Sequence, residues 1–322
     1  MTYPVAPLAL AAALAWALPG GECAQEVSTV PVRLEPAVVF KAGVDVVTLT
    51  AAVRDGRGRV VRNLRRADFE VLDRGIARDI SGFHAGDAPI SLAVLLDISG
   101  SMAVGGNIDR ARSAVSVATS MLNSTDDEAA LFTFDAKLQE VVSFTNDVDA
   151  VRHVSLEGQP WGITSLYDAI EAAARHVAER ANRHRALLVI TDGVDTGSSL
   201  SAPEVSGIAS SIDVPVYVLA VVTPLDHPGG ELAVPAAEGV TADIGTLADL
   251  SRWTGGEMKV ASVPTHVVEA IRDLFAELRY QYLITFEPGP TPGWHPLKVR
   301  IRNDDLTVHA RSGYISGPSQ SD

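Results

Sequence analysis

The sequence predicts an α/β fold in which a doubly wound, mostly parallel sheet with one antiparallel edge strand is joined to a small β-sandwich. Apolar strand-like runs alternate with segments of helical periodicity over 88–279, which is typical of a parallel sheet covered by helices on both faces. Short runs of alternating polarity, separated by turn residues, lie on either side, in 28–87 and 280–316. Neither set can cover its apolar face alone, so we expect one sandwich assembled from both ends of the chain.

The first 24 residues resemble an export signal. Residues 6–18 are almost wholly apolar and rich in Ala and Leu, and Pro19-Gly20-Gly21 ends the run. The run is shorter than the roughly 20 residues of a membrane-spanning helix. We therefore expect an exported protein of the periplasm, the cell surface or the medium, with no stable membrane span beyond this signal. Whether the signal is cleaved or retained, or whether Cys23, the single cysteine, carries a lipid, stays open.

The segment 28–87 is predicted to supply the N-terminal strands of the sandwich. Its residues from Val47 to Val53 alternate in polarity and end at Asp55-Gly56, which is a hairpin signal. A second hairpin is predicted around Asp73-Arg74-Gly75, between apolar residues of 69–71 and 76–83. The C-terminal strands that we expect to complete the sandwich are 280–286, 297–302 and 306–311.

The segment 88–279 is predicted to alternate between strands and helices. A tight hairpin places one antiparallel strand at the edge of the parallel sheet, and a capping box, Ser201-Ala202-Pro203-Glu204, begins one of the helices. The predicted strands are 91–97, 129–134, 139–144, 186–191, 214–222 and 257–260, and the predicted helices are 108–122, 165–181, 205–212, 244–253 and 265–279.

Oxygen-bearing residues lie at three points of this alternation. Asp97 ends a predicted strand and is followed by Ser99 and Ser101, Thr164 precedes a helix, and Asp192 ends the strand expected beside the first. Ligands of doubly wound sheets bind outside the carboxyl ends of such strands, and hard cations prefer hydroxyl, carboxylate and water oxygens. Each residue alone is an ordinary turn former or helix cap. Together the five predict one site for Mg²⁺, with Mn²⁺ and Ca²⁺ as alternatives.

This pattern resembles the metal-ion-dependent adhesion site of the von Willebrand factor type A domain, on Asp97-x-Ser99-x-Ser101, Thr164 and Thr191-Asp192-Gly193. Segments 68–75, 164–169, 254–256 and 313–314 also resemble the bacterial von Willebrand factor A-related subgroup known from acidobacteria. The resemblance covers nearly the whole chain beyond the signal.

The resemblance implies a role for each of the five residues. The hydroxyls of Ser99 and Ser101 would bind the ion directly, Thr164 directly or through water, and Asp97 and Asp192 mainly through bridging waters. The remaining position would accept an Asp or Glu side chain from a partner protein, and a second copy of the chain is one such partner.

Two further features are candidate contributors. Asp195 is either a supporting group behind the metal ligands or a solvated loop carboxylate. The Pro- and Gly-rich segment 224–243 is long enough to be a functional loop or an insertion without function. In the first case it is a partner-contact rim, or offers an internal carboxylate to the ion. Its acidic residues are Asp226, Glu231, Glu238 and Asp243.

Charge and missing motifs narrow the function. A net charge of −14 with no basic run argues against nucleic acid as a partner. The sequence has no His-Glu-x-x-His, no Gly-Lys pair and no Gly-x-Ser-x-Gly frame, so we expect no enzyme. Two functions stay open. One is a metal-dependent protein-binding module, and the other is a structural envelope component whose metal site only stabilises the fold.

Overall fold

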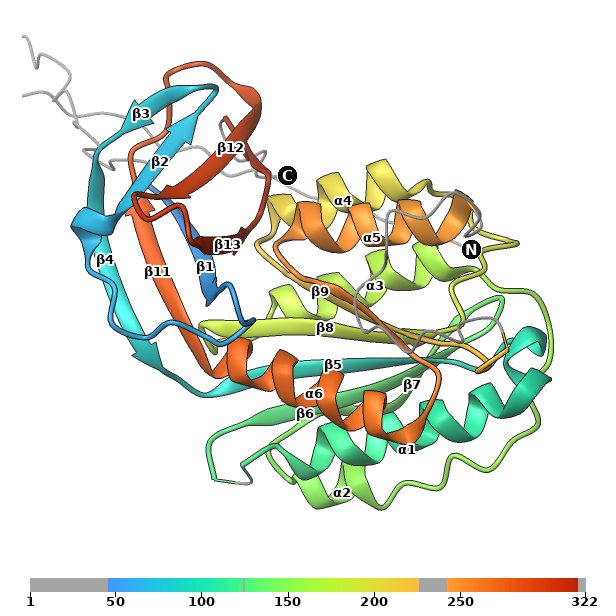
Figure 1. Cartoon of the computed structure of the whole chain (residues 1–322). Helices are drawn as coiled ribbons and strands as arrows, with labels where there is room; N and C mark the ends of the chain where they lie inside the picture. Colours follow the sequence, from blue (N-terminus) through green and yellow to red (C-terminus); the bar gives the residue numbers. More distant parts are fainter. Residues whose placement is uncertain (1–45, 124, 226–241, 318–322) are drawn as a thin grey trace, which may run out of the picture. The chain divides into compact units, whose positions relative to one another are not determined.

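The computed structural model describes residues 46–123, 125–225 and 242–317 (Figure 1). They form a mixed α/β fold with one mostly parallel six-stranded sheet and two antiparallel four-stranded sheets. The predicted export signal and Cys23 lie outside the described residues. Across the three described ranges, no helix is both long and apolar enough to cross a membrane.

The six-stranded sheet has the strand order β10-β9-β8-β5-β6-β7. All neighbouring strands are parallel except β6 and β7, whose antiparallel pairing forms the predicted edge hairpin. The four central strands are almost entirely buried, which explains their near-continuous apolar sequences. The strands are β5 (Ile90–Asp97), β6 (Glu128–Phe134), β7 (Leu138–Thr145), β8 (His184–Thr191), β9 (Val216–Val221) and β10 (Met258–Ala261).

Helices cover both faces of this sheet (Figure 1). Because successive side chains of a strand point to opposite faces, Leu92 and Val94 of β5 pack with α1, α2 and α6, whereas Ala93 and Leu95 pack with α3, α4 and α5. The helices are α1 (Asn107–Ser120), α2 (Val148–Arg152), α3 (Leu166–Ala178), α4 (Ala202–Ser211), α5 (Ala242–Thr254) and α6 (Pro264–Arg279).

The two antiparallel sheets combine strands from both ends of the chain. Their strand orders are β13-β1-β11-β4 and β14-β12-β2-β3, and both sheets contribute to one apolar cluster that includes Leu49, Val71, Tyr282 and Leu297. The strands are β1 (Val47–Asp55), β2 (Phe69–Asp73), β3 (Ile76–Arg78), β4 (Ile80–Asp87), β11 (Tyr280–Phe286), β12 (Gly293–Ile301), β13 (Leu306–Ala310) and β14 (Gly313–Ser316).

Of the two hairpins predicted in this region, one is complete and the other is reduced to a single bridge. β2 and β3 pair across a two-residue turn in which Arg74 and Gly75 both have positive φ, as a tight hairpin turn requires. The turn at Asp55-Gly56 also forms, but the following segment makes only an isolated bridge from Arg54 to Val60. The hairpin stays short because β11 occupies that edge of β1 from Val47 to Ala51, while β13 pairs with the other edge from Ala51 to Asp55.

Another prediction of strand continuity was wrong. The apolar segment 76–83 is not one strand, because the chain passes at Asp79 from β3 in one sheet to β4 in the other. The neighbouring strands β12 and β13 likewise belong to different sheets. Local polarity shows where a strand lies, but it does not show which sheet receives it.

Candidate metal centre

Asp97 and Asp192 lie at the carboxyl ends of two neighbouring parallel strands. Asp97 is the last residue of β5, and Asp192 follows the last residue of β8, which pairs with β5 up to Leu96 and Ile190. Both oxygens of the Asp97 carboxylate accept hydrogen bonds. Thr191 Oγ1 donates to Oδ2 at 2.6 Å and the Ser99 backbone N–H donates to Oδ1 at 2.8 Å. The buried Asp97 carboxylate is therefore fixed in orientation.

Ser99 and Ser101 hold two hydroxyl oxygens close together directly after β5. Ser99 is fully buried, Ser101 belongs to the 3₁₀ segment Gly100–Gly106, and their Oγ atoms are 3.2 Å apart. Two adjacent ligands of an octahedral Mg²⁺, each at about 2.1 Å from the ion, are separated by about 3.0 Å. The spacing of the two hydroxyls therefore fits neighbouring positions around one small cation.

Thr164 is brought to the same place by backbone hydrogen bonds between loops. The N–H of Gly100 donates to Gly162 O at 3.1 Å, and the N–H of Trp161 donates to Ile98 O at 3.0 Å. On the other side, the N–H groups of Thr196 and Gly197 donate to Thr164 O at 2.9 Å. The buried Thr164 thus lies in the loop between those that carry Ser99 and Asp192, and the structure brings all five predicted residues to one end of the sheet.

Asp192 carries an unsatisfied acceptor in this place. Its Oδ1 is buried and has no hydrogen-bond partner among the described residues. Burial raises the pKa of Asp192, although a hydrogen bond with the Ser101 hydroxyl opposes the rise. Burial also raises the pKa of Asp97 to about 6, and the charge of Asp192 adds to that rise. The buried carboxylate of Asp97 beside the half-buried carboxylate of Asp192, with its orphaned oxygen, is an arrangement that a cation relieves. The donor set fits a divalent metal.

Asp195 has a definite structural role next to this group. Its Oδ1 accepts the N–H of Leu166, the first residue of α3, at 2.8 Å and the hydroxyl of Ser198 at 2.6 Å. Asp195 therefore fixes the start of the helix two residues after Thr164. Of the predicted rim residues, Asp226, Glu231 and Glu238 lie outside the described residues, and only the backbone of Asp243, in α5, is described.

Thr191 is a functional candidate that sequence reasoning quoted only as part of a motif. Its hydroxyl donates to Asp97 and accepts the N–H of Gly193 at 3.0 Å, so it connects the two strand ends. A hydroxyl residue directly before the strand-ending Asp192 is the signal that indicates this role.

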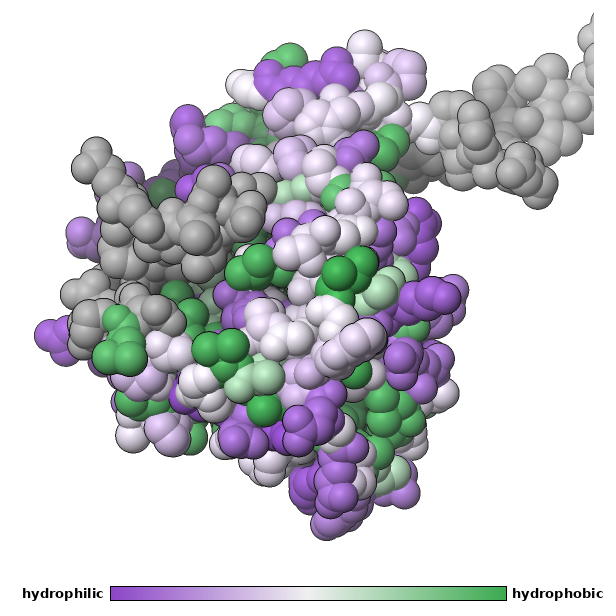
Figure 2. Space-filling model, turned by 90° about the vertical axis from the view of Figure 1, so that its right-hand side faces the viewer, coloured by the Kyte–Doolittle hydropathy of each residue, from purple (hydrophilic) through white to green (hydrophobic). Residues whose placement is uncertain are grey.

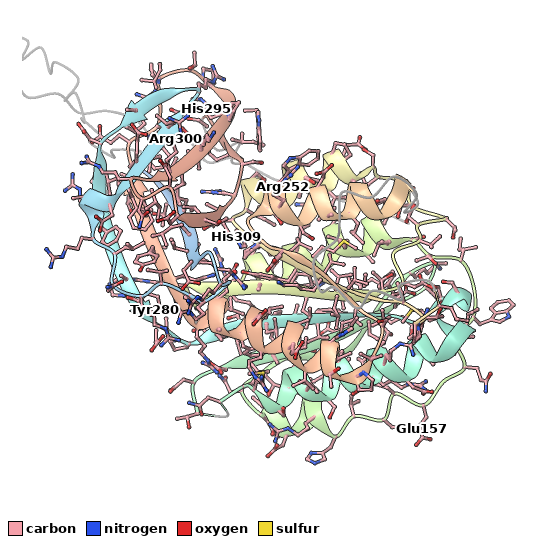
Figure 3. All side chains as sticks on the ribbon, in the orientation of Figure 1. Glu157, Arg252, Tyr280, His295, Arg300 and His309 are labelled. Atoms are coloured by element: carbon pink, nitrogen blue, oxygen red, sulfur yellow. The ribbon has the colours of Figure 1, made fainter. Side chains whose placement is uncertain are left out.

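A second group of metal-type ligands lies far from this site along the chain. Glu257, Glu277 and His309 offer atoms within 4.8 Å of one another, and His309 is labelled on β13 in Figure 3. Arg54 occupies this group. Its Nε donates to Glu277 Oε2 at 2.7 Å, and its Nη2 lies 3.4 Å from Glu257 Oε2. The arginine therefore supplies the cation, and the group is a buried ion network between the two parts of the fold.

Comparison with known proteins finds a family model that matches part of the six-stranded sheet. Residues 92–194 match the family model of the von Willebrand factor type A domain. No curated protein matches the chain. Among solved structures, BatB from Bacteroides thetaiotaomicron is 20% identical with a TM-score of 0.45, and the match covers 59% of this chain and 98% of that one. The aerotolerance-related membrane protein from Bacteroides fragilis NCTC 9343, with multiple mutations to serines, gives the same identity and coverages and a TM-score of 0.44. The PilB minor pilin from Streptococcus sanguinis is 14% identical with a TM-score of 0.42, over 64% of this chain and 65% of that one.

Proposed function

The chain contains a von Willebrand factor type A domain at residues 92–194, and from this premise we propose that it is a metal-dependent protein-binding module. Domains of this type are often protein-interaction modules and often bind a divalent metal. In this proposal, the chain has a metal-ion-dependent adhesion site and belongs to the acidobacterial subgroup that its sequence resembles. It assigns the metal to Asp97, Ser99, Ser101, Thr164 and Asp192.

The observation that carries the proposal is the orphaned Oδ1 of Asp192. A buried acceptor without a partner costs about 1–3 kcal/mol, and more when the group is charged. Here it lies beside the buried carboxylate of Asp97, whose charge opposes its own. No described side chain offsets this cost with a positive charge, so the site is built for a cation that is added after folding.

In this proposal, the five residues contact the ion in two ways, directly and through water. The Ser99 and Ser101 hydroxyls and the Thr164 hydroxyl would bind it as neutral ligands, and Asp97 and Asp192 would hold its waters. Thr191 and the Ser99 N–H keep the Asp97 carboxylate in one orientation. When bound, the ion supplies a positive charge that few direct protein charges neutralise, so that an outside carboxylate can become its last ligand.

We propose that the module is not an enzyme. A general base must have an acceptor oxygen within reach of the proton that it removes. Both Asp97 oxygens already accept hydrogen bonds from Thr191 and Ser99. The Ser99 hydroxyl contacts another hydroxyl rather than a base. These contacts position Asp97 and Ser99 as ligands, and we assign the free Oδ1 of Asp192 to the waters of the ion rather than to proton transfer.

We further propose that the protein works outside the cytoplasm and that its two antiparallel sheets act together as one β-sandwich. The apolar segment 6–18 supports export. The cluster that contains Leu49, Val71 and Leu297 supports the sandwich, because it draws on both sheets. A carboxylate from a second copy of the chain would serve the metal as well as one from another protein.

The proposal is tested by measuring metal and partner binding on the same preparations. Titration calorimetry with Mg²⁺ and Mn²⁺ should show one site in the wild type and none in Asp192→Asn. Asp109→Asn is the matched control, because Asp109 is an exposed carboxylate at the start of α1. Capture of envelope and secreted proteins on the immobilised chain should then require Mg²⁺ and fail with chelator or with Asp192→Asn.

Each outcome assigns a function. A partner held only by the wild type in Mg²⁺ supports metal-bridged binding. Metal binding without any change in capture supports the alternative, a structural envelope component in which the ion stabilises the fold. Absence of metal binding in the folded wild type would overturn both readings of the site.

A further inference from the structure

We propose that the partner's carboxylate is carried by a segment with large apolar side chains on both sides of it, because an apolar rim borders the candidate metal site. The apolar rim consists of Val104, Trp161 and Ile163. This inference rests on the proposed function and specifies its partner.

The rim residues are exposed although they are large and apolar. The exposed fraction is 63% for Val104, 83% for Trp161 and 54% for Ile163. Figure 2 views the molecule from the side toward which β5 and β8 run in Figure 1, and hydrophobic side chains emerge there among polar ones. Single exposed apolar residues are ordinary, but several gathered at one functional end indicate an interaction surface.

The rim belongs to the loops that carry the candidate ligands. Trp161 and Ile163 flank Gly162, whose carbonyl accepts the N–H of Gly100, directly between Ser99 and Ser101. Val104 lies in the same loop, at a non-helical kink shortly after Ser101.

Close approach of the loops also places the Ile163 side chain. It lies across the loop that follows Asp192, because a Cβ added to Gly197 would fall 2.8 Å from Ile163 Cδ1. The absence of a side chain at Gly197 therefore leaves room for Ile163 beside the site.

Charge decides what kind of segment fits. The site holds the carboxylates of Asp97, Asp192 and Asp195 in a chain of net charge −14, so the charge of the ion is what would draw an acidic side chain to these ligands. Its neighbours then meet Trp161 and Ile163, where contact removes apolar surface from water on both partners. Trp is also the residue type most enriched among interface residues that dominate binding energy. A partner segment with polar residues on both sides of its carboxylate would leave the apolar rim exposed to water.

The test uses short synthetic peptides whose centres are Leu-Asp-Leu, Ser-Asp-Ser and Leu-Asn-Leu. Binding to the wild-type chain is measured by fluorescence anisotropy in Mg²⁺ and in chelator. Leu-Asp-Leu should bind about tenfold more tightly than Ser-Asp-Ser, and Trp161→Ser or Ile163→Ser should remove most of that difference. The control is Ile315→Ser, because Ile315 is 63% exposed on β14 of the other part of the fold. It should leave the preference unchanged.

Tryptophan emission gives an independent readout. Burial of Trp161 by Leu-Asp-Leu should shift the emission to shorter wavelength, and Trp161→Phe should abolish the shift while Trp253 and Trp294 still emit.

The outcomes separate the inference from the function on which it rests. If the two Asp peptides bind with equal affinity, while Leu-Asn-Leu does not bind and chelator abolishes binding of both Asp peptides, the rim proposal is overturned and metal-bridged binding stands. Equal loss of preference in Ile315→Ser would also overturn it. Binding of Leu-Asn-Leu as tight as Leu-Asp-Leu, or persisting in chelator, would overturn metal bridging itself. Absence of binding by every peptide would overturn the rim proposal, while calorimetry with the metal still decides the site.

Discussion

At the scale of single residues, Glu277 has the most demanding environment outside the metal centre. It is fully buried, and its carboxylate accepts hydrogen bonds from Arg54 Nε at 2.7 Å and from the Tyr217 hydroxyl at 2.8 Å. Burial alone would raise its pKa, but His309, Arg54 and Tyr217 together hold the pKa at about 2. The charged form of Glu277 is therefore the one that the fold stabilises, and its partners depend on that charge.

Removing this charge should destabilise the fold strongly. Glu277→Gln leaves Arg54 buried without its main counter-ion, and breaking a buried pair in this way costs on the order of 3 kcal/mol. The free energy of unfolding, measured in urea, should fall by about that amount. Glu70→Gln is the matched control, since Glu70 and Arg300 form an exposed pair at 3.9 Å; its effect should stay below about 1 kcal/mol. A similar small loss for both variants would contradict the network.

Protonation of His309 should make the stability of the fold depend on pH. Burial lowers the pKa of His309, but its hydrogen bond and charge interaction with Glu277, helped by Glu257 and opposed by Arg54, raise it above the ordinary 6.5. A raised histidine pKa stabilises the fold fully below the unfolded value, and this contribution is lost as pH rises through the folded pKa. The stability difference between wild type and His309→Gln should therefore be largest near pH 6 or just below, about where the unfolded histidine titrates, and shrink at higher pH. A difference that grows with pH would reverse this sign.

At the scale of elements, two glycines differ sharply in what surrounds them. Gly207 lies within α4 with nothing within 4 Å of an added Cβ, whereas a Cβ on Gly256 would fall 2.2 Å from the carbonyl oxygen of Val216. Gly207→Ala should raise the free energy of unfolding by about 0.5–1 kcal/mol, because alanine favours the helix. Gly256→Ala should lower it by at least about 1 kcal/mol, because the loop before β10 must move away from β9. Urea unfolding of the pair gives the comparison, and a loss in Gly207→Ala would contradict it.

The sequence predicted elements better than their partners. Apart from the short helix α2, which was not predicted, the order of strands and helices from 88 to 279 follows from apolar runs and helical periodicity, and β11 matches its predicted residues, 280–286. The sorting of strands into two sheets did not follow, since β1 pairs with β11 and β13 near the other end of the chain. Turn residues act locally, and pairing between distant strands is decided by packing of the whole core.

The same limit applies to the sites. Asp97 and Asp192 are predictable neighbours because they end strands expected to lie side by side. The hydrogen bond from Thr191 to Asp97 and the orphaned Oδ1 of Asp192 require coordinates. Arg54, Glu277 and His309 come from β1, α6 and β13, and Glu257 comes from the loop before β10, so no motif spacing could reveal this group.

At the scale of the whole molecule, the α/β part and the antiparallel sheets are joined by buried polar contacts and by the chain itself. α6 ends at Arg279 and β11 begins at Tyr280, so the last helix leads directly into a central strand of an antiparallel sheet. Arg311 donates to Ser210 O at 2.7 Å and to Thr48 O at 2.6 Å, joining α4 to β1. We expect the two parts to unfold as one cooperative unit.

Two tryptophans report on the two parts separately. Trp253 lies in α5 and Trp294 in β12. In a background with both Trp16→Phe and Trp161→Phe, the variants Trp253→Phe and Trp294→Phe each leave one of these two reporters as the only tryptophan. The urea midpoint from tryptophan fluorescence should be the same for both variants. Far-ultraviolet circular dichroism of each variant gives its overall unfolding midpoint, which corrects for the effect of the substitution itself. Separate midpoints for the two reporters would show that the contacts at Glu277 and Arg311 do not couple the parts.

The pairing of β1 with β11 cannot form until the ribosome has synthesised nearly the whole chain. Thr48 and Thr285, whose hydroxyls hydrogen-bond across this pair, are 237 positions apart. At about 5–20 residues per second, a ribosome needs roughly 10–50 s to deliver the second after the first. Throughout that interval β1 has neither of its neighbours, and its alternating apolar face is open to any other unpaired strand. A chaperone that occupies residues 47–55 until the last strands emerge would therefore keep β1 from pairing with another strand during this interval.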